Sequence, residues 1–234
     1  MSHTTADVDA VEVCISGDGS TVGVASSSSS GIGASIFVRD GNAFQKRGDT
    51  FTGYGSDWSG IALSYNGTIV DMGDRVWSSG RGRVGVFQWR DDSGSGIMVW
   101  VLMGSDITGD AAGDYLGHYG CVSITNDGLT EALGAPYYDR DGLSDRGLVR
   151  VYNHDSTNDA WNQSGSDLVG DNAYDNFSKT AISSDGKYLA VGAYNVNGYV
   201  KVLAKNGTNC EMIGEKVTSG EVGRFFNPVY IGKE

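Results

Sequence analysis

The feature that most constrains this chain is a five-residue motif that occurs four times along it. Each copy has an apolar residue, Ser or Thr, any residue, Asp or Asn, and finally Gly. The copies occupy residues 15–19, 63–67, 124–128 and 182–186, so the spacing from Gly to Gly is 48, 61 and 58 residues. Recurrence at this length is typical of proteins built from stacked or radially arranged repeats, and it predicts four similar structural units.

Each copy of the motif predicts a β-hairpin. Asp-Gly or Asn-Gly between two apolar runs supplies the positive φ angles that a tight hairpin turn needs. A short run with the period-two alternation of a strand follows each Gly. These runs are residues 22–25, 70–73, 131–134 and 189–192.

Two further strands complete each predicted unit. The third strand has the form Gly-x-Val-x-Val-aromatic, which is clearest at residues 147–152 and looser at 33–38, 82–87 and 198–203. Its β-branched residues at alternate positions suit a strand with one buried face. The fourth strand carries an anchor residue four positions before a Gly, and we expect large rings at this position to pack between neighbouring units. The anchors are Phe44, Trp100, Trp161 and Cys210.

The repeat therefore predicts an all-β fold, namely a β-propeller with four blades of four antiparallel strands. We expect a single domain over residues 1–234, with blades near 11–60, 61–119, 120–179 and 180–234. Turn signals interrupt every candidate helical run, so almost no helix is expected. The alternative is part of a larger propeller that is completed by oligomerisation.

The stretch from Tyr119 through Pro136 to Tyr152 resembles an FG-GAP repeat of the integrin-alpha type, and residues 98–204 carry the pattern best. The resemblance implies a propeller of a kind used outside cells for adhesion, ligand binding and assembly. Members of this family often bind calcium in an Asp-rich hairpin loop. The hairpins of this chain, such as the one at residues 126–128, offer too few oxygen ligands, so those calcium sites are not carried over to them.

One other loop keeps an acidic spacing that suits a hard cation. Asp139, Asp141 and Asp145 supply three carboxylates, and Gly142 permits a sharp bend. The other interpretation of this loop is a solvated turn region, because Asp and Gly are common turn formers. Calcium at this loop is the one cofactor or metal that the sequence suggests.

Charge and hydropathy exclude several classes of partner. The net charge of −12 argues against nucleic acid and against an anionic membrane surface, both of which need a basic patch. No apolar run is long enough to span a bilayer, and residues 1–12 show no signal-peptide core. The family resemblance and four Asn-x-Ser/Thr sequons favour an extracellular or cell-surface location.

No catalytic constellation is evident in the sequence. His3, His118 and His154 are dispersed, and surface or loop positions are expected for them. The pairs Asp110/Asp114 and Asp171/Asp175 recur at equivalent repeat positions, which favours a structural role in turns over catalysis. We therefore expect no enzyme activity.

Aromatic residues suggest a binding surface instead. Tyr137, Tyr138, Trp77 and Tyr194 each follow the second strand of a unit, and such loops gather on one face of a propeller. Beside Asp and Asn they suit stacking on sugars or anchoring a protein. Ordinary loop packing is the alternative interpretation of these four residues.

The sequence thus predicts a non-catalytic recognition or assembly module that binds a protein or glycan, as in extracellular adhesion. The alternatives are a carbohydrate-binding, lectin-like propeller and a glycan-active hydrolase with a degenerate motif. A carboxylate pair in the central funnel that the other blades do not share would indicate the hydrolase. Residues 229–231 fill a fifth first-strand position, which would close the ring or join a neighbouring copy in a homo-oligomer.

Overall fold

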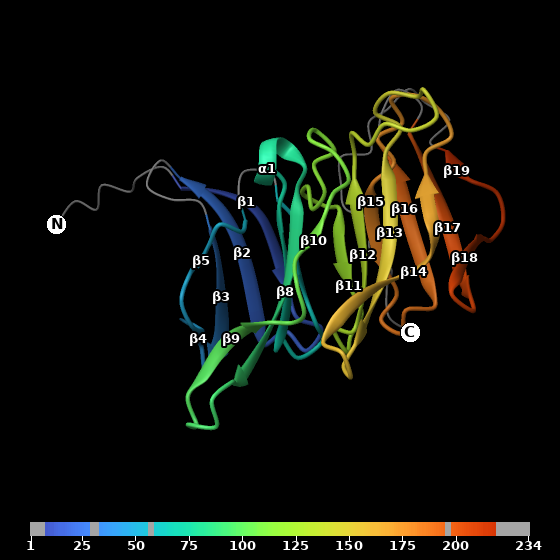
Figure 1. The fold of residues 1–234 in the computed structure, drawn as a ribbon. Coiled ribbons are helices and arrows are strands. Elements are labelled where there is room, and N and C mark those ends of the chain that lie inside the picture. The colour runs from blue at the N-terminus through green and yellow to red at the C-terminus, as the bar shows by residue number, and fades with distance from the viewer. Residues whose placement is uncertain (1–7, 29–32, 56–58, 195–197, 219–234) are drawn as a thin grey trace.

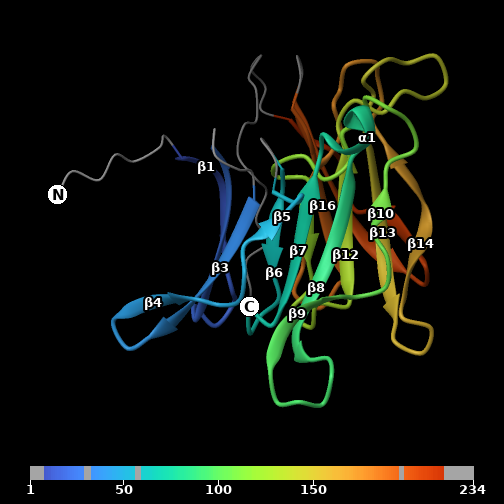
Figure 2. The ribbon, with the colours of Figure 1, turned by 60° about the vertical axis from the view of Figure 1, so that its left-hand side comes forward.

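The computed structural model describes residues 8–28, 33–55, 59–194 and 198–218. This part of the chain forms four antiparallel sheets arranged as a four-bladed β-propeller, as the sequence predicts. Figure 1 shows the sheets side by side in chain order, and Figure 2 shows them from a second direction. The helical content of the described residues is one short element, α1 (Trp77–Gly80). These residues include no helix with the length and apolar character needed to cross a membrane.

Each blade is built from four or five strands that are consecutive in the chain. The first blade consists of β1 (Val8–Ile15), β2 (Thr21–Ser28), β3 (Gly33–Asp40), β4 (Ala43–Lys46) and β5 (Phe51–Thr52). The second consists of β6 (Ile61–Leu63), β7 (Ile69–Asp74), β8 (Arg83–Asp91), β9 (Met98–Leu102) and β10 (Ile107–Thr108). The third consists of β11 (Val122–Ile124), β12 (Thr130–Ala135), β13 (Leu148–Asp155) and β14 (Ala160–Val169). The fourth consists of β15 (Lys179–Ile182), β16 (Tyr188–Ala193), β17 (Tyr199–Asn206), β18 (Asn209–Met212) and β19 (Val217–Thr218).

Every sheet has four strand positions, and the fourth position is interrupted in three of the blades. β4 and β5 both pair with β3, β9 and β10 both pair with β8, and β18 and β19 both pair with β17. In the third blade β14 runs unbroken along β13, with a register shift between Val149 and Val151. Gly48 and Gly104 lie at the interruptions with φ of 70° and 69°, a left-handed conformation that glycine adopts without steric cost.

The repeated Ser/Thr and Asp/Asn side chains hold the hairpin turns together. Thr125 donates from Oγ1 to Asp127 Oδ1 at 2.6 Å and accepts the Thr130 backbone N–H at 3.1 Å. Asp127 Oδ1 also accepts the Leu129 backbone N–H at 3.0 Å, and Gly128 has a φ of 74°. The same hydroxyl-to-Asx hydrogen bond is made by Ser16, Ser64 and Ser183. The motif is therefore a self-contained turn, and the four predicted hairpins are confirmed.

Neighbouring blades pack face to face, and each blade uses two different faces. We call the side toward the next blade the leading face and the side toward the preceding blade the trailing face. In the third blade the leading face presents Ala132, Val149 and Val151, which pack against Leu189 and Val191 on the trailing face of the fourth. The first and second blades repeat this arrangement at their own leading faces, with Ala25, Ala34, Ile36 and Val84.

The predicted anchors lock one blade onto the preceding one. The indole Nε1 atoms of Trp100 and Trp161 donate to the backbone carbonyls of Arg47 and Met103, each at 3.0 Å. The Trp100 ring lies so close to Gly48 that a Cβ added there would come within 2.8 Å of it. Large rings at this position do pack between units, as predicted.

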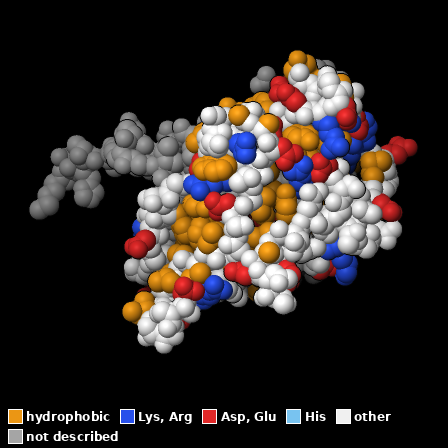
Figure 3. All heavy atoms as spheres, viewed as in Figure 1, with side chains coloured by type: hydrophobic (Ala, Val, Ile, Leu, Met, Phe, Trp, Pro, Cys, Tyr) orange, Lys and Arg blue, Asp and Glu red, His pale blue; other side chains and the backbone are white. Residues whose placement is uncertain are grey.

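Hydrophobic side chains also gather over the first two blades on the side seen in Figure 3.

Two carboxyl groups are sealed between the second and third blades. Asp71 on β7 and Glu131 on β12 have no exposed surface, and their oxygens find no hydrogen-bond partner elsewhere in the described residues. Burial raises the pKa of Asp71 to about 7. Burial and the nearby Asp71 raise the pKa of Glu131 well above its usual range. This pair therefore keeps protons at a pH at which exposed carboxyls have lost them.

The sealed pair predicts a stability that declines toward high pH. The unfolded carboxyls titrate near 3.8 and 4.5, so between that range and about pH 7 the folded state binds more protons than the unfolded one. Their contribution to the free energy of unfolding is therefore full below about pH 4 and is lost as pH rises through 7. Replacing both residues, Asp71→Asn with Glu131→Gln, should flatten this decline in urea unfolding at pH 5 and pH 8. Asp92→Asn, at an exposed position, is the control, and an unchanged decline in the double variant would contradict the assignment.

The turn motif predicts a loss of stability when its hydroxyl is removed. Thr125→Ala leaves the Thr130 N–H without its hydroxyl acceptor, so the free energy of unfolding should fall by about 1 kcal/mol. Thr125→Ser keeps the hydroxyl and should stay close to wild type. Urea unfolding of the three proteins measures the difference, and equal stability of the Ala and Ser variants would show that the hydroxyl contributes nothing.

Candidate active site at the end of the central cavity

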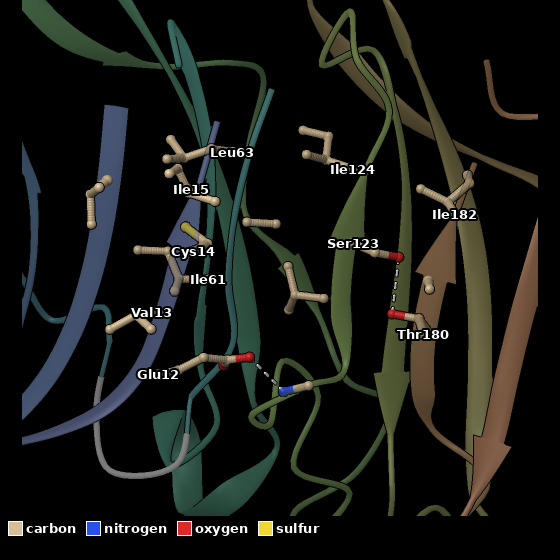
Figure 4. A pocket seen from close by; sticks show the side chains of 15 residues that line it. Glu12, Val13, Cys14, Ile15, Ile61, Leu63, Ser123, Ile124, Thr180 and Ile182 are labelled. Carbon is tan, nitrogen blue, oxygen red and sulfur yellow. Dashed lines mark hydrogen bonds between the residues drawn. The ribbon is translucent and has the colours of Figure 1, made fainter. Parts of the chain in front are cut away.

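The first strands of all four blades line a central cavity of about 490 Å³. Its wall is mainly apolar, because the apolar residue that opens each repeat motif points into it (Figure 4). These residues are Ile15, Leu63, Ile124 and Ile182. Polar groups gather at one end of the cavity, where Glu12 reaches toward the backbone of Gly120.

Glu12 is the acidic group of this end of the cavity. The pairing of β1 with β2 shifts register between Ala10 and Glu12, a bulge of the kind that re-aims side chains. Glu12 Oε1 accepts the Gly120 backbone N–H at 3.0 Å. The other oxygen, Oε2, is buried and has no hydrogen-bond partner among the described residues. Burial raises the pKa of Glu12 to about 7, so the group changes charge near neutral pH.

Lys179 on β15 brings a positive charge to the same end. Its Nζ donates to the backbone carbonyl of Tyr119 and lies 3.6 Å from the centroid of the Tyr119 ring and 5.2 Å from that of Tyr194. The side chain is buried. Burial of an ammonium is tolerated here because a carbonyl and two ring faces replace water. This charge acts against the burial effect at Glu12 and lowers the pKa of that carboxyl.

His118 is the third titratable group of the cluster. Its ring is buried, with its centroid 4.6 Å from that of Tyr119 and 6.4 Å from that of Tyr137. Burial, followed by the positive charges of Lys179 and Arg75, lowers the pKa of His118 to about 3. The imidazole is therefore neutral at physiological pH. His118 lies in the loop between β10 and β11, as expected, but its ring is buried beside the tyrosines and not at the surface.

Sequence reasoning missed Glu12 and Lys179, although a signal for them exists. Both stand three positions before the apolar residue that opens the repeat motif, where the second and third blades have Gly60 and Cys121. Charged residues thus interrupt the first-strand pattern only in the first and fourth blades. A difference from the repeat is informative because an active site is unique, whereas turn and packing residues recur.

The structure brings together two of the four aromatic residues that were predicted to bind a ligand. Tyr137 and Tyr194 share a side-chain hydrogen bond beside Lys179 and His118. Tyr138 packs against the core between the second and third blades. Trp77 lies away from the cluster under Arg83, whose Cζ is 5.6 Å from the ring centroid. A ligand-binding role for these four residues stays a prediction.

The acidic loop that suggested calcium is held by the protein's own groups. Asp139 Oδ1 accepts the Asp145 backbone N–H at 2.8 Å, and Asp141 forms an ion pair with Arg146 at 3.0 Å. Across the described residues, His, Cys, Asp and Glu side chains form no group of three or more that would hold a metal ion. Calcium at this loop stays a prediction, and its geometry adds no support.

The recurring Asp pairs have the structural role that was expected. Asp114 Oδ2 accepts the Ala111 backbone N–H at 2.7 Å. Asp175 Oδ2 accepts the N–H groups of Asp171 and Asn172 at 2.8 and 2.9 Å. These carboxylates close their own loops, so they are not offered to a ligand.

The chain is a β-propeller, and solved structures with the same architecture give it context. It superposes on a candidate 6-phosphogluconolactonase from Bacteroides fragilis with a TM-score of 0.58 and 15% identity, over 92% of this chain and 57% of the other. It superposes on the periplasmic gluconolactonase PpgL of Pseudomonas aeruginosa with a TM-score of 0.61 and 14% identity, over 91% and 59%. Saccharomyces cerevisiae Sqt1 gives a TM-score of 0.56 and 15% identity, over 92% and 50%. The chain thus spans little more than half of the length of these proteins.

No family model matches the sequence, so the FG-GAP resemblance gains no support at that level. No curated protein sequence matches it either.

The comparisons correct two of the sequence-based predictions. The chain was expected to be a non-catalytic recognition or assembly module and not an enzyme. Three of the similar structures are named as lactonases, which are hydrolytic enzymes, and a further one is the hydrazine synthase of Kuenenia stuttgartiensis. The hydrolase alternative is therefore better supported than a non-catalytic module. Identities of 14–15% establish the fold, and the activity of this chain has to be argued from its own site.

The cluster predicts a measurable electrostatic coupling. Lys179→Met removes the charge that lowers the pKa values of Glu12 and His118, so both should rise, that of Glu12 above about 7. Side-chain carboxyl and imidazole shifts followed by NMR against pH measure this. Lys187→Met, which removes an exposed lysine from a turn, should leave both pKa values in place. Unchanged values in Lys179→Met would contradict the coupling.

Proposed function

We propose that this chain is a hydrolase of the lactonase class, with Glu12 as the general base. The observation that carries the proposal is the buried, unpartnered Oε2 of Glu12 at the end of the cavity, on a carboxyl whose pKa is raised to about 7. A base of that pKa accepts protons efficiently at neutral pH. The names of the similar structures supply the substrate class, an intramolecular ester of a sugar acid.

The reaction uses Glu12 Oε2, which has no hydrogen-bond partner among the described residues, and the positive charge of Lys179. A water molecule donates a hydrogen bond to Glu12 Oε2, and its oxygen attacks the lactone carbonyl carbon while Glu12 takes the proton. The ring C–O bond then breaks, and Glu12 returns the proton to the departing oxygen, which gives the open hydroxy acid. The positive charge of Lys179 favours the negative charge that develops on the carbonyl oxygen in this step.

The tyrosines of the same end suit a polyhydroxylated substrate. Tyr137 is partly exposed and shares a hydrogen bond with Tyr194, so the two offer ring faces and hydroxyl groups beside the cluster. We propose these two, of the four predicted aromatic residues, as substrate contacts. The periplasmic location of the Pseudomonas aeruginosa neighbour is compatible with a location outside the cytoplasm for this chain.

The test is Glu12→Gln, which keeps the size of the side chain and removes the base. Hydrolysis of gluconolactone and of 6-phosphogluconolactone above the spontaneous rate should fall by at least about 100-fold. In the wild type, kcat/KM should rise with pH up to about 7 and then level off, because Glu12 must be ionised to accept a proton. Continuous titration with alkali of the acid that the reaction releases measures the rate of each variant and the pH dependence of kcat/KM.

Glu215→Gln is the matched control, since it makes the same change at an exposed position and should keep the wild-type rate. Wild-type activity in Glu12→Gln would show that another group acts as the base. No hydrolysis of either lactone by the wild type would overturn the proposed class.

A further inference from the structure

The trailing face of the first blade has the composition of a buried interface but lies open. Val13 on β1 is 60% exposed, whereas the residues at the equivalent position of the next two blades, Ile61 and Val122, are 4% and 7% exposed. Val22 and Val24 on β2 are partly exposed, although their counterparts in the second blade are completely buried. No strand of this blade packs extensively against the fourth within the described parts of the chain. The face therefore has the residues of an interface without its partner.

The leading face of the fourth blade is open in the complementary way. Val200 and Val202 on β17 are partly exposed. The equivalent valines of the third blade, Val149 and Val151, are buried against the fourth. The small residues Ala190 and Gly192 pair with them across the sheet, as Ala132 and Gly134 do one blade earlier. This surface is thus a leading face with no trailing face on it.

The anchors show the same mismatch at the two ends. Phe44 stands where Trp100 and Trp161 stand, but 48% of its surface is exposed, because no blade packs on that side of it within the described residues. Gly214 stands where Gly48 stands in the first blade and has a φ of 71°, yet nothing lies within 4 Å of the position of an added Cβ. The first blade therefore presents an anchor ring, Phe44, that packs on no glycine of a neighbouring blade. The fourth blade presents the matching glycine, Gly214, with no ring packed on it.

We propose that two copies of this chain associate head to tail, with the fourth blade of each packed on the first blade of the other. The trailing face of the first blade and the leading face of the fourth are the two halves of the interface that the chain repeats three times internally. A second copy supplies the missing half at both ends, so two contacts related by a twofold axis close a ring.

The association also completes the central cavity. One copy lines it with only four first strands, and the exposed Val13 and Ile15 lie along its open side. A partner's fourth blade on that side covers both residues, and the closed ring adds the partner's four first strands to the wall. Burial of such an apolar surface is the driving force for association.

Sedimentation velocity or light scattering over a range of concentrations tests the proposal. The wild type should be a dimer that dissociates on dilution. Val13→Glu on the trailing face and Val202→Glu on the leading face should each be monomeric, because a charge in either half spoils both contacts of the ring. Ile97→Glu, at an apolar residue that is exposed away from both faces, should remain dimeric. Circular dichroism and thermal melting check that each variant is folded.

Mixing the two interface variants distinguishes a head-to-tail contact from other dimers. Val13→Glu keeps an intact leading face and Val202→Glu keeps an intact trailing face, so an equimolar mixture should form a heterodimer through one good contact. Phe44→Ala should raise the dissociation constant by at least about tenfold, since a buried aromatic anchor is lost.

A wild type that stays monomeric at every concentration would overturn the proposal. The two open faces would then be explained by packing against further blades of a longer chain. A dimer that persists in Val202→Glu, or a mixture of the two variants that stays monomeric, would also overturn it.

Discussion

The packing of a leading face on a trailing face is the interaction on which the rest of the structure depends. A leading face such as that of the third blade combines small residues on one strand with valines on the next, and larger apolar residues fill the space. The hairpin turns add backbone hydrogen bonds between blades, as from the N–H of Tyr65 to the carbonyl of Asn126 at 2.9 Å. A blade alone would expose both faces, so each unit is stable only against its neighbours.

The candidate site follows from departures from this repeated packing. The first strands of the blades share their direction and their apolar opening residue, so each blade contributes a similar stretch of the cavity wall. Chemistry requires one place in that wall to differ. Glu12 and Lys179 supply the difference, because the first and fourth blades place them at the same strand position where the second and third have small residues. Lys179 lies beside Gly120 at one end of the cavity, and its charge acts there on the Glu12 carboxyl.

The sequence predicted the features that recur and missed those that occur once. Hairpins, blade strands and anchors could be predicted because four copies of each are written in the chain, with turn chemistry that is local. Burial of His118 could not, since it depends on loops from different blades that meet only in the folded protein. The pKa of Glu12 likewise comes from desolvation by distant residues. The fifth first strand predicted at residues 229–231, with the homo-oligomer contact through it, lies outside the described residues.

Two sets of buried carboxyls show why access, and not an unusual pKa alone, marks a catalytic candidate. A carboxylate pair in the central funnel that the other blades do not share was expected to indicate a hydrolase. Asp71 and Glu131 are not shared by the other blades, but they do not lie in the central cavity. Both are sealed between blades, with no exposed surface and no place in the cavity wall. Their raised pKa values therefore reflect the free-energy cost of ionising carboxyl groups that are buried between blades, and this cost lowers the stability of the fold at high pH. The pKa of Glu12 is raised by the same cause, but Glu12, unlike Asp71 and Glu131, is a residue of the cavity lining. Of the three carboxyls it is therefore the one that lies next to space a substrate could enter.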